Sequence, residues 1–153
     1  KWLLVLKPDA DEAMQIAALA HDIERGVYKK KGSGELSKDY EKYKEQHAKK
    51  SAEIICKLLR KYNFEKSFIE KVDHLVRLHE VGGDEDTNFI RDADSISFFE
   101  ENLQHYFEKY GVDRTKFKIK FMFERVSVGA KEIIRRFNFR NSVLNSLFRG
   151  IVN

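Results

Sequence analysis

The chain has 153 residues, of which 42% are hydrophobic and 35% charged, a balance that excludes a disordered chain and suits one compact domain. No apolar run approaches the roughly 20 residues that cross a bilayer, so we expect no membrane-spanning segment. The net charge of +4 is spread along the sequence, which argues against nucleic acid as a partner.

Helix breakers and cysteines are both scarce. The sequence has one proline and eight glycines, which predicts a mostly helical chain. The single cysteine, Cys56, excludes an intrachain disulfide and a cysteine-based zinc site. Because no secretion signal is visible, this cysteine usage predicts a cytoplasmic protein.

The first predicted helix covers residues 1–7, of which residues 2–6 are apolar, and it ends at Pro8. No capping residue precedes it, so we expect the natural protein to extend upstream, with the start of this helix missing here. The next helix begins at Asp9 or Asp11, which cap its N-terminus. We expect it to end near Gly26, because glycine tolerates the left-handed conformation that ends many helices.

Two helices are predicted in the middle of the chain. Ser37 caps a long helix that extends to about Tyr62, and Asn63 breaks its pattern. Residues 64–81 form the following helix, which the glycine pair at 82–83 ends.

The last third of the sequence is also predicted to be helical. One helix extends from about Asp86 to Tyr110 and ends at Gly111. Residues 113–137 fit both a strand-like alternation and a helical spacing, and the helical pattern is the longer. A short helix over residues 141–150 closes the chain. These elements predict an all-α single domain of about seven helices over residues 1–153, with a core over 1–110 and C-terminal helices over 112–153.

An ionisable pair, His21 and Asp22, follows the apolar residues 16–20 near the end of a predicted helix. An unpaired carboxylate there would be costly, so a positive group must face it. A divalent cation beside the last turn would satisfy both imidazole and carboxylate. The alternative is a capping histidine, with Asp22 paired to Arg25 or a nearby lysine.

A second acidic feature lies inside the helix predicted from about residue 86. Asp94 is four residues from Ile90 and from Phe98, so it shares a largely apolar face and is expected to point inward. Asp92 is expected to meet Arg91 or solvent. The alternative is a helix with two ordinary surface acids.

Two further histidines lie on separate predicted helices. His47 precedes a face of small residues, and His79 lies at the C-terminal end of its helix, where it would complement the helix dipole. Packing or capping is the alternative role for each of them.

Taken together, these segments resemble the HD-domain superfamily of metal-dependent phosphohydrolases, and its small stand-alone bacterial members most of all. The resemblance covers roughly residues 1–110 and rests on the order of four motifs. These are Ala-Leu-Ala-His21-Asp22-Ile-Glu-Arg, His47-Ala-Lys-Lys-Ser-Ala, Leu-Val-Arg-Leu-His79-Glu and Asp92-Ala-Asp94-Ser-Ile.

The resemblance implies one divalent metal held by His21, Asp22 and Asp94. In that family an upstream histidine completes the ligands, and we expect it in the segment that precedes Lys1. Nitrogen and oxygen ligands suit Mn²⁺, Fe²⁺, Ni²⁺, Co²⁺ or Mg²⁺. His47 and His79 are expected to bind a second ion or the substrate.

The implied activity is hydrolysis of a nucleotide or another phosphate ester, a small phosphorylated molecule. Asp22 or Glu24 is expected to take the proton of the attacking water. Arg25 is the candidate phosphate clamp, and Lys29, the first of three consecutive lysines, would neutralise a phosphate tail. An alternative for Arg25 is a salt bridge to Asp22 or Glu24.

Two other functions stay open. A di-iron oxygenase of HD-like fold would use His47 and His79 as ligands. A non-catalytic binding or regulatory domain would use the C-terminal tail from Asp113, whose aromatic and basic residues suit a partner or a homodimer.

Overall fold

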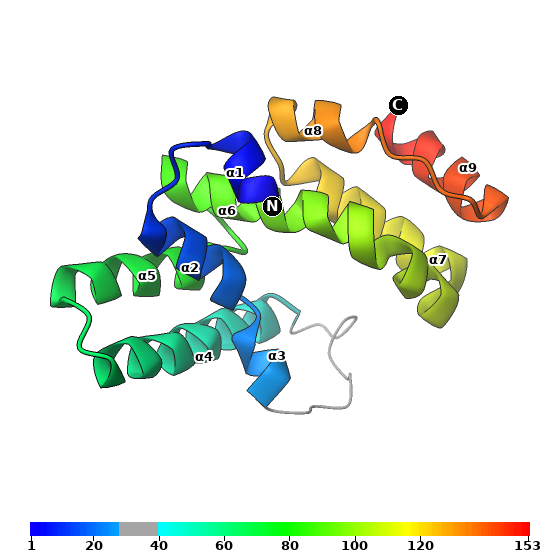
Figure 1. Cartoon of the computed structure of the whole chain (residues 1–153). Coiled ribbons are helices and arrows are strands. Elements are labelled where there is room, and N and C mark those ends of the chain that lie inside the picture. The colour runs from blue at the N-terminus through cyan, green and yellow to red at the C-terminus, as the bar shows by residue number, and fades with distance from the viewer. Residues whose placement is uncertain (28–39) are drawn as a thin grey trace. The chain divides into compact units, whose positions relative to one another are not determined.

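The computed structural model describes residues 1–27 and 40–153, and the regular structure within these ranges is entirely helical (Figure 1). The all-α prediction is therefore confirmed. Among the described helices, none combines the length and the apolar character needed to cross a membrane. The elements are α1 (Trp2–Leu6), α2 (Glu12–Ala20), α3 (Ile23–Val27), α4 (Tyr40–Lys61), α5 (Lys66–Leu78), α6 (Glu85–Ser97), the π-helical η1 (Phe98–Asn102), α7 (Leu103–Glu124), α8 (Val128–Ile134) and α9 (Ser142–Val152).

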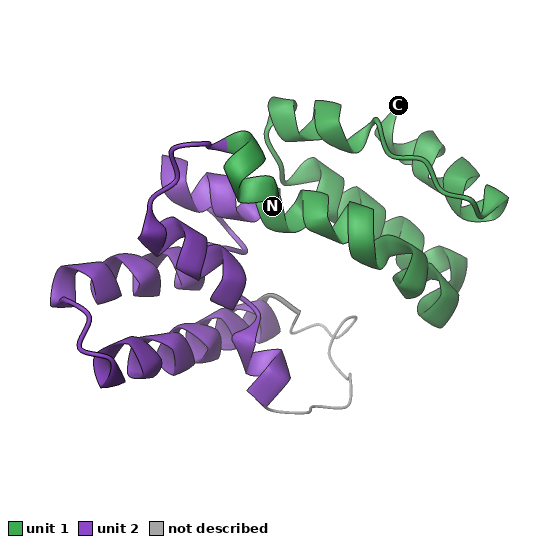
Figure 2. Cartoon of the chain, in the orientation of Figure 1, with its two compact units in different colours: residues 1–6, 92–153 green, residues 7–91 purple. Residues whose placement is uncertain are grey.

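These helices form two compact units, which Figure 2 shows in different colours. One unit comprises residues 7–91, and the other comprises residues 1–6 with 92–153. The units divide inside α6, whereas the sequence suggests a division near residue 111. That all of these residues form one domain stays a prediction.

In the unit of residues 7–91, α4 packs against α5 and α2 packs against both. Alanines at the contacts let the helix backbones approach closely, and they are almost completely buried: Ala13, Ala17, Ala48 and Ala52. Asp11 begins α2, because its Oδ1 accepts a hydrogen bond from Met14 N at 2.9 Å. Of the two predicted caps, the structure therefore uses Asp11.

The helix predicted to reach Gly26 is interrupted. It ends at Ala20, a turn contains His21 and Asp22, and α3 follows. Gly26 lies inside α3 and does not adopt a left-handed φ, so its predicted capping role is wrong. Two other predicted breaks are confirmed, because Asn63 and Gly82 have φ angles of 58° and 73°. The predicted cap Ser37 lies outside the described residues.

In the other unit, α7 packs against α9 around a core of buried aromatic and aliphatic residues. Phe99 and Phe148 are fully buried there, with ring centroids 5.7 Å apart. Each such ring removes 150–250 Å² of surface from water, roughly, which makes this pair a main source of stability.

Irregular turns divide the helices of this unit. Leu103 N bonds to Phe98 O, the i to i+5 spacing of a π-helix. Gly111 has a φ of 74°, so α7 is kinked where the sequence predicts a helix end. After α7, Ser127 caps α8, and Asn141 caps the predicted final helix. The helix predicted over residues 113–137 is thus divided at residues 125–127.

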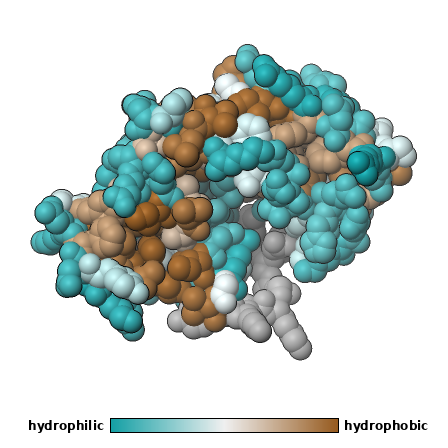
Figure 3. All heavy atoms as spheres, in the orientation of Figure 1, coloured by the Kyte–Doolittle hydropathy of each residue, from teal (hydrophilic) through white to brown (hydrophobic). Residues whose placement is uncertain are grey.

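Large apolar side chains also lie on the surface, where hydrophobic and hydrophilic groups alternate on the face shown in Figure 3. Leu19 is 87% exposed on α2, Val128 is 73% exposed on α8, and Tyr62 is 65% exposed just after α4. Because they lie on different elements, their exposure alone singles out no docking face.

Candidate metal centre

The turn between α2 and α3 presents the pair of residues 21 and 22. His21 is the C-cap of α2, and its Nδ1 donates a hydrogen bond to Ala18 O at 2.9 Å. This bond satisfies a carbonyl that the end of the helix leaves open. It also fixes the ring, whose Nε2 lies 3.9 Å from Oδ2 of Asp22.

Asp22 lies between two cationic or potentially cationic groups. Its Oδ1 is 2.6 Å from Nε2 of His47, and its Oδ2 is 3.1 Å from Nη1 of Arg25. The side chain is about one-third exposed, whereas that of Arg25 is more than half exposed. The sequence offered a capping His21 and an Asp22–Arg25 pair as an alternative to a metal site, and the structure contains both. It also adds the contact of Asp22 with His47, which the sequence did not predict.

His47 is buried on α4, between two carboxylates. Its Nδ1 lies 3.1 Å from Oε2 of Glu24, opposite the contact of its Nε2 with Asp22. Burial lowers the pKa of this imidazole, but the hydrogen bond and charge of Asp22 and the bond to Glu24 outweigh burial. The pKa of His47 is therefore raised above its ordinary value.

His79 is the C-cap of α5 and is 1% exposed. Its Nδ1 donates to Val76 O at 2.7 Å, and its Nε2 lies 3.8 Å from Oε1 of Glu80. The ring lies edge-on to two other imidazoles, with centroid distances of 5.0 Å to His21 and 6.0 Å to His47. Three of the chain's histidines are thus gathered at one place.

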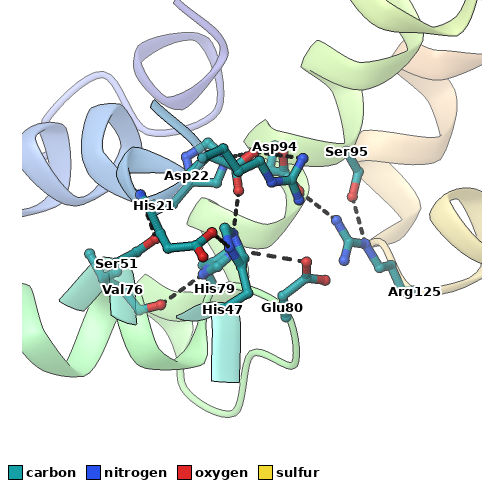
Figure 4. A network of polar contacts seen from close by, with 12 residues as sticks. His21, Asp22, His47, Ser51, Val76, His79, Glu80, Asp94, Ser95 and Arg125 are labelled. Carbon is teal, nitrogen blue, oxygen red and sulfur yellow. Dashed lines mark hydrogen bonds and ion pairs between the residues drawn. The ribbon is translucent and has the colours of Figure 1, made fainter. Parts of the chain in front are cut away.

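Asp22, His47 and His79 offer ligand atoms that all lie within 4.8 Å of one another (Figure 4). We refer to these three residues as the triad. Two imidazoles and one carboxylate are a donor set that suits a divalent transition metal. Both imidazoles are held through Nδ1, by a carboxylate and by a backbone carbonyl, as is usual for metal-binding histidines. By this test the residues fit a metal ion.

Asp94 and Asp92 belong to the other unit. Oδ2 of Asp94 is 2.7 Å from Nη2 of Arg125, which also donates from Nε to Ser95 Oγ (Figure 4). Asp92 is only 3% exposed and accepts from Ser127 N at 3.3 Å. The expectation that Asp94 is the more inward of the two, with Asp92 in solvent, is therefore wrong, because the side chain of Asp94 is 22% exposed.

Other predicted site residues have the following positions. Glu24 is buried against His47, and Arg25 lies beside Asp22. His21 is outside the triad but borders it through its ring contact with His79. Lys29 lies outside the described residues.

Two residues that surround His47 on α4 are not among the site residues that the sequence predicts. Ser51 Oγ accepts a hydrogen bond from Glu24 N at 3.3 Å, and the ring of Tyr43 stacks on that of His47 at a centroid distance of 6.4 Å. Their four-residue spacing on either side of His47 places all three on one helix face. This four-residue spacing is the sequence signal that could identify Tyr43 and Ser51 as neighbours of His47.

One comparison with known proteins gives a match. The family model described as Domain of unknown function (DUF4202) covers residues 1–146. No curated protein and no solved structure matches the chain.

Proposed function

The chain belongs to the DUF4202 family, and we propose that it is a metal-dependent phosphohydrolase acting on a nucleotide or another phosphate ester. The observation that carries this proposal is the triad, whose ligand atoms lie within 4.8 Å of one another. The sequence motifs that resemble the HD-domain superfamily support the same function.

Asp22, His47 and His79 would hold the ion in this proposal. A bound divalent ion supplies a water of lowered pKa and polarises a phosphoryl oxygen. The imidazole ligands favour Mn²⁺, Fe²⁺, Co²⁺ or Ni²⁺ over Mg²⁺. The resemblance also makes His21 an expected ligand, and its Nε2 lies 3.9 Å from Oδ2 of Asp22.

Two side chains of the turn and α3 have distinct tasks. Oδ2 of Asp22 is the carboxylate oxygen that does not contact His47, and it would accept the proton of the attacking water once Arg25 binds phosphate in its place. Arg25 is more than half exposed, and its guanidinium binds two phosphoryl oxygens side by side. Lys29 is expected to bind a further phosphate group.

Asp94 stays an expected ligand on the strength of the resemblance alone. An Asp94→Asn variant tests this role, with Arg125→Gln as its control, because the two side chains form an ion pair. A ligand role predicts that only Asp94→Asn weakens metal binding. Equal metal affinity in the two variants would restrict Asp94 to the ion pair.

The alternative activity is a di-iron oxygenase. It is favoured by the inclusion of both His47 and His79 in the triad, because both would have to be ligands. Two irons per chain and substrate-dependent oxygen uptake would support it, and one metal with phosphate release would exclude it.

A cytoplasmic location is part of the main proposal, since the single cysteine of this sequence fits a reducing compartment. A homodimer stays an expectation.

Phosphate release tests the proposed function directly. The full chain is assayed on a panel of phosphorylated metabolites with Mn²⁺, Mg²⁺ or Ni²⁺, beside Asp22→Asn and the control Asp9→Asn. Asp9 is a highly exposed acid outside the site. We expect metal-dependent activity in the wild type and the control, and a loss of about 100-fold or more in Asp22→Asn. Equal activity in all three would contradict the proposal.

A further inference from the structure

Glu24 is a buried carboxylate whose side chain is only 8% exposed. It lies in the first turn of α3, two residues after Asp22, and its Oε2 is 3.1 Å from Nδ1 of His47. A carboxylate that is closed to solvent in this way is poorly placed to contact a substrate or an attacking water. The burial of Glu24 therefore serves its contact with the imidazole of His47.

The bond to Glu24 decides how the ring of His47 is used. With Nδ1 turned to Glu24, the other nitrogen, Nε2, is the one that lies 2.6 Å from Oδ1 of Asp22. Without an acceptor at Nδ1, the imidazole could rotate or exchange its two nitrogens. A hydrogen-bond acceptor behind a metal-binding histidine fixes both the orientation and the tautomer of the ring.

A second contact holds Glu24 itself. Its backbone N donates to Ser51 Oγ at 3.3 Å, and Ser51 lies one helical turn after His47 on the same face of α4. The side chain and the backbone of Glu24 are thus fixed by two residues of one helix. This arrangement locks the start of α3 against α4 in one register.

From these contacts we propose that Glu24 is a positioning residue, which holds Nδ1 of His47 so that Nε2 points toward Asp22 and His79. This inference rests on the proposed function, because it assigns Glu24 a task at the proposed metal site. It gives Glu24 a role through His47 and leaves the proton-accepting role to Asp22. His79 differs, because its Nδ1 bonds to the neutral backbone carbonyl of Val76.

Three variants of the full chain test this role. Glu24→Leu removes the acceptor, Glu24→Gln keeps the shape and an amide oxygen that still accepts, and Glu45→Leu is the control at an exposed position of α4. Two readouts are taken. Binding of Co²⁺ is followed by its visible absorption, and the Nδ1–H resonance of His47 is followed by NMR in the metal-free protein.

We expect Glu24→Leu to weaken Co²⁺ binding by about 10–100-fold, to alter the absorption spectrum and to lose the slowly exchanging Nδ1–H resonance. Glu24→Gln is expected to recover most of the affinity, and Glu45→Leu to match the wild type. Should Glu24→Leu fail to fold, Glu24→Ala removes the same acceptor, and unchanged Co²⁺ affinity with an unchanged Nδ1–H resonance in Glu24→Ala would overturn the proposal.

The outcomes separate this inference from the proposed function. Wild-type binding of Co²⁺ with equal affinity and spectrum in Glu24→Leu would overturn the role of Glu24 and leave the metal site standing. Absence of Co²⁺ binding by the wild type would overturn both, even if the Nδ1–H resonance still depended on Glu24.

Discussion

Nε2 of His47 lies 2.6 Å from Oδ1 of Asp22, although 25 positions separate the two residues in the sequence. This contact joins α4 to the turn after α2 and brings an imidazole to a carboxylate that already faces Arg25. With His79 from the end of α5, it places donors from three segments within reach of one ion.

Metal binding should stabilise the folded chain. At a free Mn²⁺ concentration one hundred times the dissociation constant, linkage predicts a gain of about 2.7 kcal/mol in the free energy of unfolding. The gain should disappear in His79→Gln, which removes one ligand, and persist in His105→Gln, whose histidine is exposed on α7. Thermal unfolding with and without Mn²⁺ measures this gain. If Mn²⁺ raised the unfolding temperature equally in both variants, His79 would not belong to the site.

The start of α6 gives a prediction about stability. Thr87 N donates to Asp84 Oδ1 at 2.9 Å, and Asp84 N donates back to Thr87 Oγ1 at 3.0 Å, a reciprocal cap. Asp84→Ala should therefore lower the free energy of unfolding by about 1 kcal/mol in urea titrations. Asp9→Ala, at a largely exposed acid, is the control and should change it far less. A cost no larger than that of the control would show that this cap is dispensable.

The same cap predicts a dependence on pH. The hydrogen bond from Thr87 N, with help from His74, holds the pKa of Asp84 below its usual 3.8. The ionised carboxylate thus stabilises the fold above that value, and this stabilisation is lost as the pH falls through the lower folded-state pKa. Asp84→Asn lacks this charge, so its stability should approach that of the wild type between about pH 5 and pH 3. A constant difference in urea titrations across this range would contradict the prediction.

The aromatic core of the other unit should be sensitive to truncation. Phe148 is fully buried against Phe99 and Phe139, so Phe148→Ala should cost about 3–5 kcal/mol in the free energy of unfolding. Phe117 is 51% exposed, and Phe117→Ala should stay within about 0.5 kcal/mol of the wild type. Denaturant unfolding of both variants makes the comparison, and similar costs would contradict the assignment of the core.

Local signals predicted much of the fold because the causes are local. Asp11, Asn63 and Asn141 are residues that cap or end helices through their own side chains or a left-handed φ, and the structure uses all three in this way. The all-α class follows from the scarcity of proline and glycine in the sequence.

The remaining features depend on contacts that spacing does not reveal. Asp92 is buried and accepts a hydrogen bond from Ser127 N, and Asp94 meets Arg125, so helical period alone assigns their faces wrongly.

At the candidate site, the sequence predicted which residues lie together better than how their side chains meet. His21, Asp22, His47 and His79 were all identified, and the structure gathers them. The burial of Glu24 depends on His47, which lies 23 positions away, and no periodic pattern connects the two. Such pairings appear only once the helices have packed.

A crystal structure of the chain grown with Mn²⁺ would locate the divalent metal that we propose the triad to hold. We expect an anomalous scattering peak within bonding distance of Asp22, His47 and His79. Crystals that contain Mn²⁺ only elsewhere, or that show none at the triad at saturating concentration, would contradict it.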